Sequence, residues 1–323
     1  MTKQEALEKF KEEEREYLED RKRQFFMELQ EKAGEVSDVI KRAFSSLREE
    51  IERGEKEKIM FFYFSLLRID VLNKNYNVLV QAMDARWYMD REPARVTFSL
   101  AFLFSKLDGI RERLELDGKK YIGKINRYDV SHIFQETVME CNQILAGQLR
   151  FLFRDIEENR DFSYIPKLDT WGIYWGEYRD ASEIIACVDR EKKEQKDWDR
   201  ALRLTKEMEG VMTSKFWYEA DLKDSDCRGK TLLFNQFENC TLTNLCFDEA
   251  NLSGSRFKNC TMKACSFLNA VIQQADFVDC VWDGNDFDGA DLTYSIFMEK
   301  DVPHLHLDPG QLQTILIDRR VQE

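Results

Sequence analysis

The chain has 323 residues, of which 43% are hydrophobic and 34% charged, a mixture that can bury a core and excludes wholesale disorder. Its 61 acidic residues outnumber its 48 basic residues and give a net charge of −13, so a general nucleic-acid-binding surface, which would be basic, is not expected. The charged amino terminus lacks a secretion signal, and the longest apolar stretch, Ile59 to Leu67, is shorter than the roughly 20 residues of a membrane-spanning helix. We therefore expect a cytoplasmic protein with no membrane partner.

Residues 1–218 have the apolar spacing and the low proline content of long helices. Thr2 and Glu5 have the spacing of a capping box, which predicts that a charged helix begins there. Apolar positions between Val36 and Ile51 predict a second amphipathic helix. Further helical stretches are predicted at roughly 56–73, 77–90, 94–116, 128–160 and 180–213. The prediction for residues 1–218 is an all-α helical bundle domain.

The segment from Trp171 to Tyr178 is unusually aromatic for a helical domain. Because Trp and Tyr dominate binding hot spots, one interpretation is a binding surface that contains Trp171, Tyr174, Trp175 and Tyr178. The other interpretation, which we favour, is a loop or short hairpin that packs into the bundle. The sequence leaves both open.

From Leu222 to Phe297 every fifth residue is apolar, over sixteen consecutive positions. The residue two places before each of them is small in most units, as in Ala220, Cys240 and Ala250. Neither the helical period of 3.6 nor a simple alternation gives this pattern. A short extended piece followed by a corner does, because residues two apart in a strand share a face. Units this short bury their apolar face only by stacking, which predicts a solenoid.

A second regularity, of twenty residues, sets the number of sides of the solenoid. Phe237, Phe257, Phe277 and Phe297 form one column, and Phe247, Phe267 and Phe287 form another. The two columns between them are aliphatic, except that one of them ends in Trp282. A coil of twenty residues with four sides of five residues explains all four columns.

These residues resemble the pentapeptide-repeat family, whose unit reads A-(D/N)-L-x-x. The best matching units begin at Ala220, Ala250, Ala275 and Ala290. The resemblance covers about 80 of the 323 residues and implies a right-handed quadrilateral β-helix of about four coils at residues 219–300. The units with Lys230, Asn235, Leu245 and Asn285 at the small position depart from the pattern. The predicted fold class is therefore α+β with two domains, a helical bundle followed by this β-helix.

The cysteines are best explained by the repeat. Six of the eight lie within residues 220–300, and no C-x-x-C pair is present. We interpret them as small apolar fillers of a crowded interior rather than as metal or redox residues. We expect neither a metal nor another cofactor.

An open end of the solenoid would expose core and unpaired strand edges, so caps are expected. Residues 301–323 are predicted to form the C-terminal cap, with a short helix from Gln311 to Asp318. At the other end, Phe216 and Trp217 are candidates for covering the first coil. A cap that carries Leu305, Leu307 and Leu312 also suits a homodimer contact.

Six aspartates give the second half of the repeat an acidic surface, and the register predicts that all six point outward. They are Asp276, Asp279, Asp283, Asp286, Asp288 and Asp291. Simple solvation explains them. The alternative comes from the family, since some pentapeptide-repeat proteins resemble duplex DNA in shape and charge and bind type II topoisomerases.

The charge of the repeat argues against DNA mimicry. Four coils at about 4.8 Å form a rod of roughly 19 Å. Duplex DNA of that length carries about 11 negative charges. Residues 220–300 contain 13 acidic and 7 basic residues, which is a net charge of 7 − 13 = −6.

The preferred hypothesis is a non-enzymatic interaction or scaffold protein whose helical domain binds another protein. It is motivated by a strong scaffold signal and by the lack of a recognisable catalytic motif. The first alternative is a DNA-mimicking regulator or inhibitor of a type II topoisomerase such as gyrase. The second is a ligand-binding or catalytic helical domain.

Overall fold

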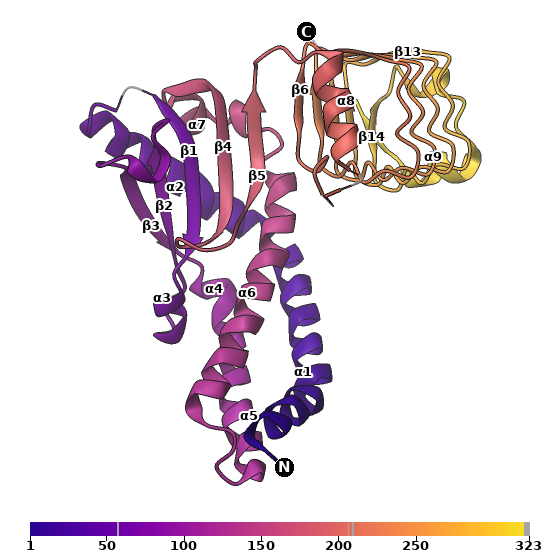
Figure 1. The fold of residues 1–323 in the computed structure, drawn as a ribbon. Helices are drawn as coiled ribbons and strands as arrows, with labels where there is room; N and C mark the ends of the chain where they lie inside the picture. Colours follow the sequence, from indigo (N-terminus) through magenta and orange to yellow (C-terminus); the bar gives the residue numbers. More distant parts are fainter. Residues whose placement is uncertain (57, 206, 209, 320–323) are drawn as a thin grey trace. The chain divides into compact units, whose positions relative to one another are not determined.

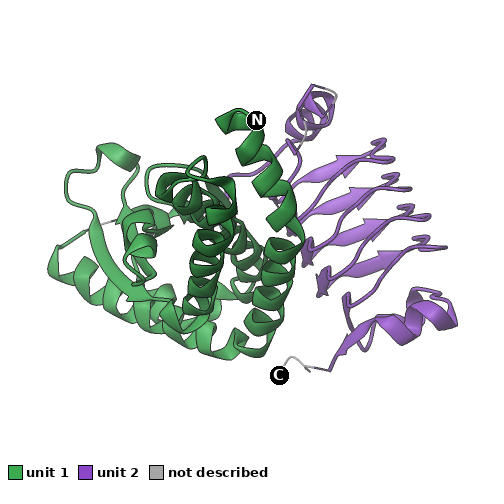
Figure 2. Cartoon of the chain, turned by 90° about the horizontal axis from the view of Figure 1, so that it is seen from below, with its two compact units in different colours: residues 1–186 green, residues 187–323 purple. Residues whose placement is uncertain are grey.

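The computed structural model describes residues 1–56, 58–205, 207, 208 and 210–319. The chain forms two compact units, residues 1–186 and 187–323 (Figure 2). The boundary differs from the one that the sequence predicts at residue 218. Residues of the segment 187–218, such as Trp198 and Trp217, share the hydrophobic core of the second unit.

Four long helices dominate the first unit: α1 (Lys3–Glu31), α2 (Ala33–Arg53), α5 (Asp108–Gly118) and α6 (Arg127–Leu152). The predicted capping box is present, because Thr2 Oγ1 accepts from the backbone N–H of Glu5 at 3.2 Å. Helices α1, α5 and α6 pack together into what we call the helical stem, whose far end is at the bottom of Figure 1. The shorter helices are α3 (Arg68–Leu72), α4 (Ala101–Phe104), α7 (Arg160–Tyr164) and the 3-10 turns η1 (Trp87–Met89), η2 (Ser105–Leu107), η3 (Lys119–Tyr121) and η4 (Ile156–Glu158).

The prediction of an all-α bundle is wrong, because the first unit also contains a five-stranded sheet of order β3-β2-β1-β4-β5. Strand β1 is antiparallel to β2 and parallel to β4. The predicted helices at 56–73, 77–90, 94–116 and 180–213 are strands in whole or in part. The strands are β1 (Ile59–Leu66), β2 (Asn77–Met83), β3 (Ala94–Ser99), β4 (Lys167–Glu177) and β5 (Ser182–Asp189).

The sequence of β1 explains why a helix was predicted at residues 56–73. It reads IMFFYFSL, and as the central strand it carries large residues on both faces, so the alternation of a half-exposed strand is lost. A short apolar run of this kind is ambiguous between a strand and a buried helix. Its aromatic residues favour the strand.

Helices cover one face of this sheet (Figure 1). Phe64 of β1 points to that face and lies against Phe44 of α2 and Trp175 of β4, each with ring centroids 5.6 Å away. Phe44 in turn contacts Phe162 of α7 at 5.0 Å. The core of the first unit therefore lies between the sheet and α2, α6 and α7.

The second unit contains the predicted four-sided solenoid. One wall is a six-stranded parallel sheet: β6 (Phe216–Tyr218), β8 (Gln236–Glu238), β10 (Arg256–Lys258), β12 (Asp276–Val278), β14 (Ile296–Met298) and β15 (Leu316–Asp318). A second wall consists of β7 (Asp221–Lys223), β9 (Thr241–Thr243), β11 (Thr261–Lys263) and β13 (Val281–Asp283). Parallel bridges from Asp226 to Cys246 and from Thr231 to Asn251 belong to the other two walls.

Every paired residue in these walls is twenty positions from its partner, as in Phe257 with Phe277. The six strands of the first wall are separated by five such steps, so the solenoid makes about five turns. This is one turn more than the sequence analysis counted, because the wall begins at Phe216 and continues through β15.

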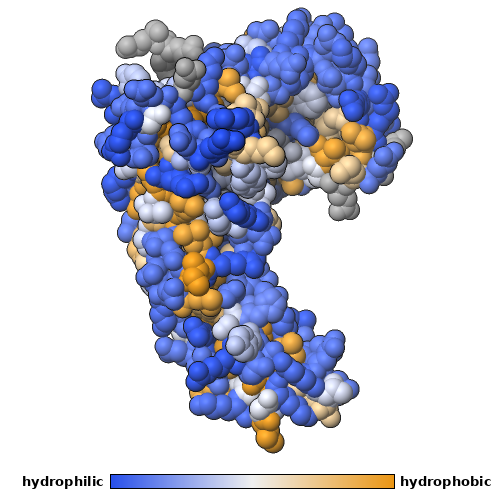
Figure 3. Space-filling model, turned by 60° about the vertical axis from the view of Figure 1, so that its left-hand side comes forward, coloured by the Kyte–Doolittle hydropathy of each residue, from blue (hydrophilic) through white to orange (hydrophobic). Residues whose placement is uncertain are grey.

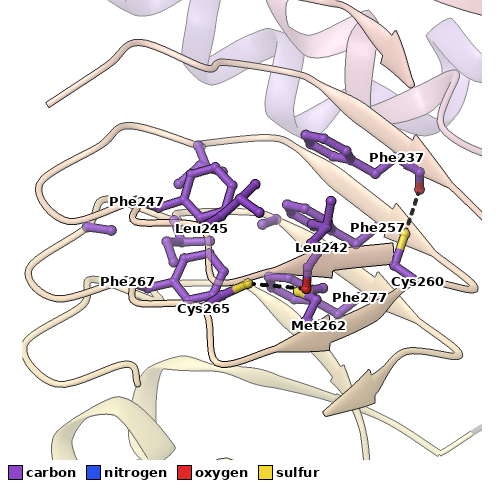
Figure 4. Packing of buried hydrophobic residues seen from close by; sticks show 14 of the residues in the cluster. Phe237, Leu242, Leu245, Phe247, Phe257, Cys260, Met262, Cys265, Phe267 and Phe277 are labelled. Carbon is purple, nitrogen blue, oxygen red and sulfur yellow. Dashed lines mark hydrogen bonds between the residues drawn. The ribbon is translucent and has the colours of Figure 1, made fainter. Parts of the chain in front are cut away.

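The phenylalanine columns fill the interior of the solenoid as predicted (Figure 4). The rings of Phe237 and Phe257 stack at 4.7 Å with an interplanar angle of 1°. Phe247 and Phe267 stack at 5.1 Å in the second column. Phe257 has no exposed surface, which confirms the register of the repeat.

Both ends of the solenoid are covered. At the first coil, α8 (Gln195–Leu204) places the buried ring of Trp198 against Trp217 at 4.8 Å and Phe237 at 5.9 Å. At the last coil, Leu305 and Ile315 are buried, and α9 (Pro309–Thr314) precedes β15. The 3-10 turn η5 (Val302–His304) lies between β14 and α9.

Candidate interaction surfaces

The predicted aromatic segment is strand β4, and its side chains point to opposite faces of the sheet. Trp171 and Trp175 point to the helices and are 3% and 1% exposed. The indole N–H of Trp175 donates to Asn142 Oδ1 at 2.8 Å. Tyr178 follows the strand and is 40% exposed, with the Arg179 guanidinium 5.3 Å from its ring. The four predicted residues therefore do not form one surface, and the two tryptophans belong to the core.

Tyr174 lies on the other face of β4, away from the helices, and begins an aromatic group that the sequence analysis missed. Its ring stacks on Tyr63 of β1 at 4.6 Å with an interplanar angle of 6°. The indole N–H of Trp87 donates to the Tyr63 hydroxyl at 3.0 Å, and the Tyr88 ring lies 5.5 Å from the Tyr63 ring. Phe61 contacts Trp87 at 6.0 Å. We call Phe61, Tyr63, Trp87, Tyr88 and Tyr174 the aromatic face.

The loop that follows β2 brings Trp87 and Tyr88 onto the sheet, and Asp90 fixes this loop. The buried Asp90 carboxylate accepts from the backbone N–H of Asp84 at 3.0 Å and of Glu92 at 3.1 Å, and it pairs with Lys56. Burial alone would raise the pKa of Asp90, but the Lys56 ammonium and the two N–H groups outweigh burial and lower it. The carboxylate therefore stays charged at neutral pH and can keep its contacts with Lys56, Asp84 and Glu92.

The outer part of the aromatic face is accessible to a partner. Trp87 is 45% exposed, Tyr88 46% and the adjoining Met89 82%. Burial raises the pKa of Tyr63 to about 12, so its hydroxyl stays protonated at neutral pH. Exposed Trp, Tyr and Met beside each other are typical of protein-binding surfaces. The signal in the sequence was the run Trp87-Tyr88-Met89, which the predicted helix at 77–90 obscured.

The six predicted aspartates are not equivalent. Asp276 keeps the outward register position beside Arg256, but it is buried and pairs with Arg256 at 3.3 Å, so it is not accessible to a partner. Asp279 and Asp291 are half-buried; Lys300 lies 3.4 Å from the first, and Thr293 and Gln273 donate to the second. The exposed ones are Asp283, Asp286 and Asp288.

The three exposed aspartates occupy one coil rather than a stripe along the rod. The wall position of Asp286 is held by Ser266, Cys246 and Asp226 in the preceding coils. The exposed aspartates therefore form a local cluster of negative charge. They do not repeat along the rod as phosphates repeat along duplex DNA.

The described residues offer no assembled metal site, since no group of three or more His, Cys, Asp or Glu side chains among them could hold a metal ion. All eight cysteines are free. Burial raises the pKa of Cys280 to about 12, so this thiol is protonated at neutral pH and inert as a nucleophile. Across the described ranges, no helix combines the length and apolar character needed to cross a bilayer.

Comparison with known proteins identifies the type of repeat in the second unit. A sequence profile of the pentapeptide repeat region matches residues 230–307. No curated protein gives a significant match. Among solved structures, the chain is similar to a pentapeptide repeat protein, Rfr23, from the cyanobacterium Cyanothece 51142, with 19% identity, a TM-score of 0.23 and coverage of 24% of this chain and 52% of that one.

Two further solved structures cover the same part of the chain. HetL, a pentapeptide repeat protein involved in heterocyst differentiation regulation in Nostoc sp. strain PCC 7120, is 19% identical with a TM-score of 0.26, over 27% of this chain and 40% of HetL. QnrB1, a plasmid-mediated fluoroquinolone resistance protein, is 22% identical with a TM-score of 0.24, over 27% of this chain and 50% of QnrB1. The chain thus spans about half or less of the length of these proteins.

Proposed function

We propose that this chain, whose second unit is a pentapeptide-repeat solenoid, is a non-enzymatic interaction protein that binds another protein through its first unit. The observation that carries the proposal is the aromatic face, where Trp87 and Tyr88 are nearly half exposed on the side of the sheet opposite α2 and α7. The rings are held by mutual contacts and by the hydrogen bond to Tyr63, so little side-chain entropy is lost when a partner binds. The surface is therefore preorganised.

The solenoid supports the role of a scaffold. Its interior is filled from Trp217 to Phe297 by buried apolar side chains. Backbone hydrogen bonds connect each coil to the next, as in Thr241 N–H to Ala220 O at 2.8 Å. A rod of this kind is stiff and presents its polar wall residues at fixed spacing.

Affinity purification of the full-length chain from its native host tests the proposal. We expect a stoichiometric protein partner with the unaltered chain and its loss with the double variant Trp87→Ala and Tyr88→Ala. Ile69→Asp is the matched control, because Ile69 is 64% exposed on α3, outside the aromatic face. Absence of a partner, together with turnover of a metabolite by the purified chain, would favour an enzyme and overturn the proposal.

The alternative of a topoisomerase inhibitor rests on Asp283, Asp286 and Asp288, which project from one coil of the solenoid. It predicts inhibition of gyrase supercoiling that weakens when all three become asparagine. No inhibition at micromolar protein would end this alternative. The charge cluster is local, which is why the aromatic face is preferred.

Self-association through the C-terminal cap is a second part of the proposal. Leu312, Leu316 and Ile317 are 44%, 48% and 44% exposed at the end of the solenoid, whereas Leu305 is buried and Leu307 half-buried. Two caps that meet would bury these side chains. Light scattering should then give a dimer mass that falls to the monomer mass in the variant Leu316→Asp and Ile317→Asp, and a monomer in the unaltered chain would refute this part.

A further inference from the structure

The far end of the helical stem combines exposed apolar side chains with an excess of positive charge. Ile122, in the turn between η3 and α6, is 91% exposed, and Tyr128, at the start of α6, is 86% exposed. Leu116 and Met1 are 62% and 60% exposed. The lower end of the first unit in Figure 3 shows hydrophobic side chains protruding there from a mostly hydrophilic surface.

The anchored residues around Ile122 and its backbone conformation direct its side chain into solvent. On either side of it, Tyr121 and Ile125 are buried. The Tyr121 hydroxyl donates to Glu13 Oε2 at 2.7 Å and its ring lies 5.5 Å from Phe10 of α1, which ties the turn to the stem. Ile122 itself has a φ of 48°, in the left-handed region that a β-branched residue rarely adopts. The fold accepts this strain and leaves the isoleucine in solvent.

Four cations surround this isoleucine, and residues 118–128 contain no acid. They are Lys119, Lys120, Lys124 and Arg127. Lys120 forms an ion pair with Asp117, with 2.6 Å between Nζ and Oδ1, and Lys124 donates to the Met1 carbonyl. Lys119 and Arg127 are exposed and have no ion-pair partner among the described residues. In a chain with a net charge of −13, four basic residues within eleven positions that contain no acid form a distinctive local excess of positive charge.

We propose that this tip, residues 116–128 with Met1, docks peripherally on an anionic lipid bilayer, with Ile122 inserted at the boundary between the headgroups and the acyl chains. Basic side chains near an anionic leaflet raise affinity by about five-fold each. An exposed apolar side chain at the end of a rigid turn enters a fluid interface, whereas a protein partner would have to offer a matching pocket. Docking on a membrane surface differs from the expectation from the sequence, which was no membrane partner. The inference concerns surface docking alone and is independent of the proposed protein partner.

Vesicle sedimentation with the full chain tests the proposal. We expect binding to vesicles of phosphatidylcholine with one third phosphatidylglycerol, little binding to pure phosphatidylcholine, and a loss of binding as salt rises. Ile122→Asp should weaken binding by about ten-fold. The variant Lys119→Glu and Arg127→Glu should weaken it by about twenty-fold or more.

Matched controls separate the tip from charge and hydrophobicity elsewhere. Ile69→Asp changes an exposed isoleucine of the same unit, and the variant Arg42→Glu and Arg91→Glu removes the same charge from exposed sites outside the tip. Both should bind as the unaltered chain does, and all variants should keep its melting temperature. No binding to anionic vesicles, binding that Ile122→Asp leaves unchanged, or equally strong binding to soluble polyglutamate would overturn the proposal; the last result would indicate an acidic protein instead.

Discussion

The Sγ–H of Cys260 donates to the carbonyl oxygen of Phe237, 3.4 Å away and one coil earlier. Cys280 makes the same contact with Phe257 at 3.4 Å, and the Ser255 hydroxyl makes it with Leu232 at 3.0 Å. The small position of the repeat therefore takes a side chain of small volume, and a Cys or Ser there also donates to a carbonyl of the preceding coil. This explains why Cys, Ser and Asn recur there beside Ala.

Truncation inside a phenylalanine column should be costly. Phe257 lies between Phe237 and Phe277 and has no exposed surface, so Phe257→Ala should lower the free energy of unfolding by about 3–5 kcal/mol. The adjacent Lys258 points outward, and Lys258→Ala should change the free energy of unfolding by less than about 0.5 kcal/mol. Urea titration of both variants gives the comparison, and equal losses would contradict the register.

Alkaline pH should destabilise the solenoid through its buried thiols. Burial raises the pKa of Cys280 from 9.0 to about 12, so the folded state holds a proton that the unfolded state releases. Stability from this thiol is fully present below pH 9 and is lost as the pH rises toward 12. Melting temperatures between pH 8 and 11 should therefore fall less steeply in Cys280→Ala than in the unaltered chain. Parallel curves would argue against a buried, protonated Cys280.

The C-terminal cap depends on one buried amide. Gln311 Nε2 donates to the carbonyl oxygens of Phe287 at 2.8 Å and Ala290 at 2.9 Å, at the last coil. Gln311→Ala would leave both carbonyls without this donor and should cost about 1–3 kcal/mol. Gln313 is exposed in the same helix, so Gln313→Ala is the control and should be nearly neutral. If thermal melts show the two variants to be alike, Gln311 does not close the solenoid.

The solenoid could be predicted because its pattern is local and repeated. The five-residue period fixes which residues point inward, and the twenty-residue period fixes which ones stack. The first half-coil was missed although Met212 and Trp217 continue the same spacing before Leu222, and both are buried. Asn235 and Asn285, which depart from the small position, donate to the carbonyls of Met212 and Met262 and so fulfil the same role as cysteine.

The first unit could be predicted only in part, because its sheet is assembled from distant segments. The parallel pairing of Phe62 with Ile173 joins residues more than a hundred positions apart, and no local period reports it. Burial of β1 on both faces also removed the alternation that identifies a strand. The aromatic face was missed for the same reason, since Tyr63, Trp87 and Tyr174 come together only in the folded sheet.

Hydrogen–deuterium exchange of the full chain, alone and with the protein captured from the native host, tests the central claim most directly. The account predicts slower exchange in β1, in the loop at 84–92 and in β4, with the walls of the solenoid unchanged. Protection confined to residues 276–291 would contradict it and would place the partner on the aspartates of the solenoid.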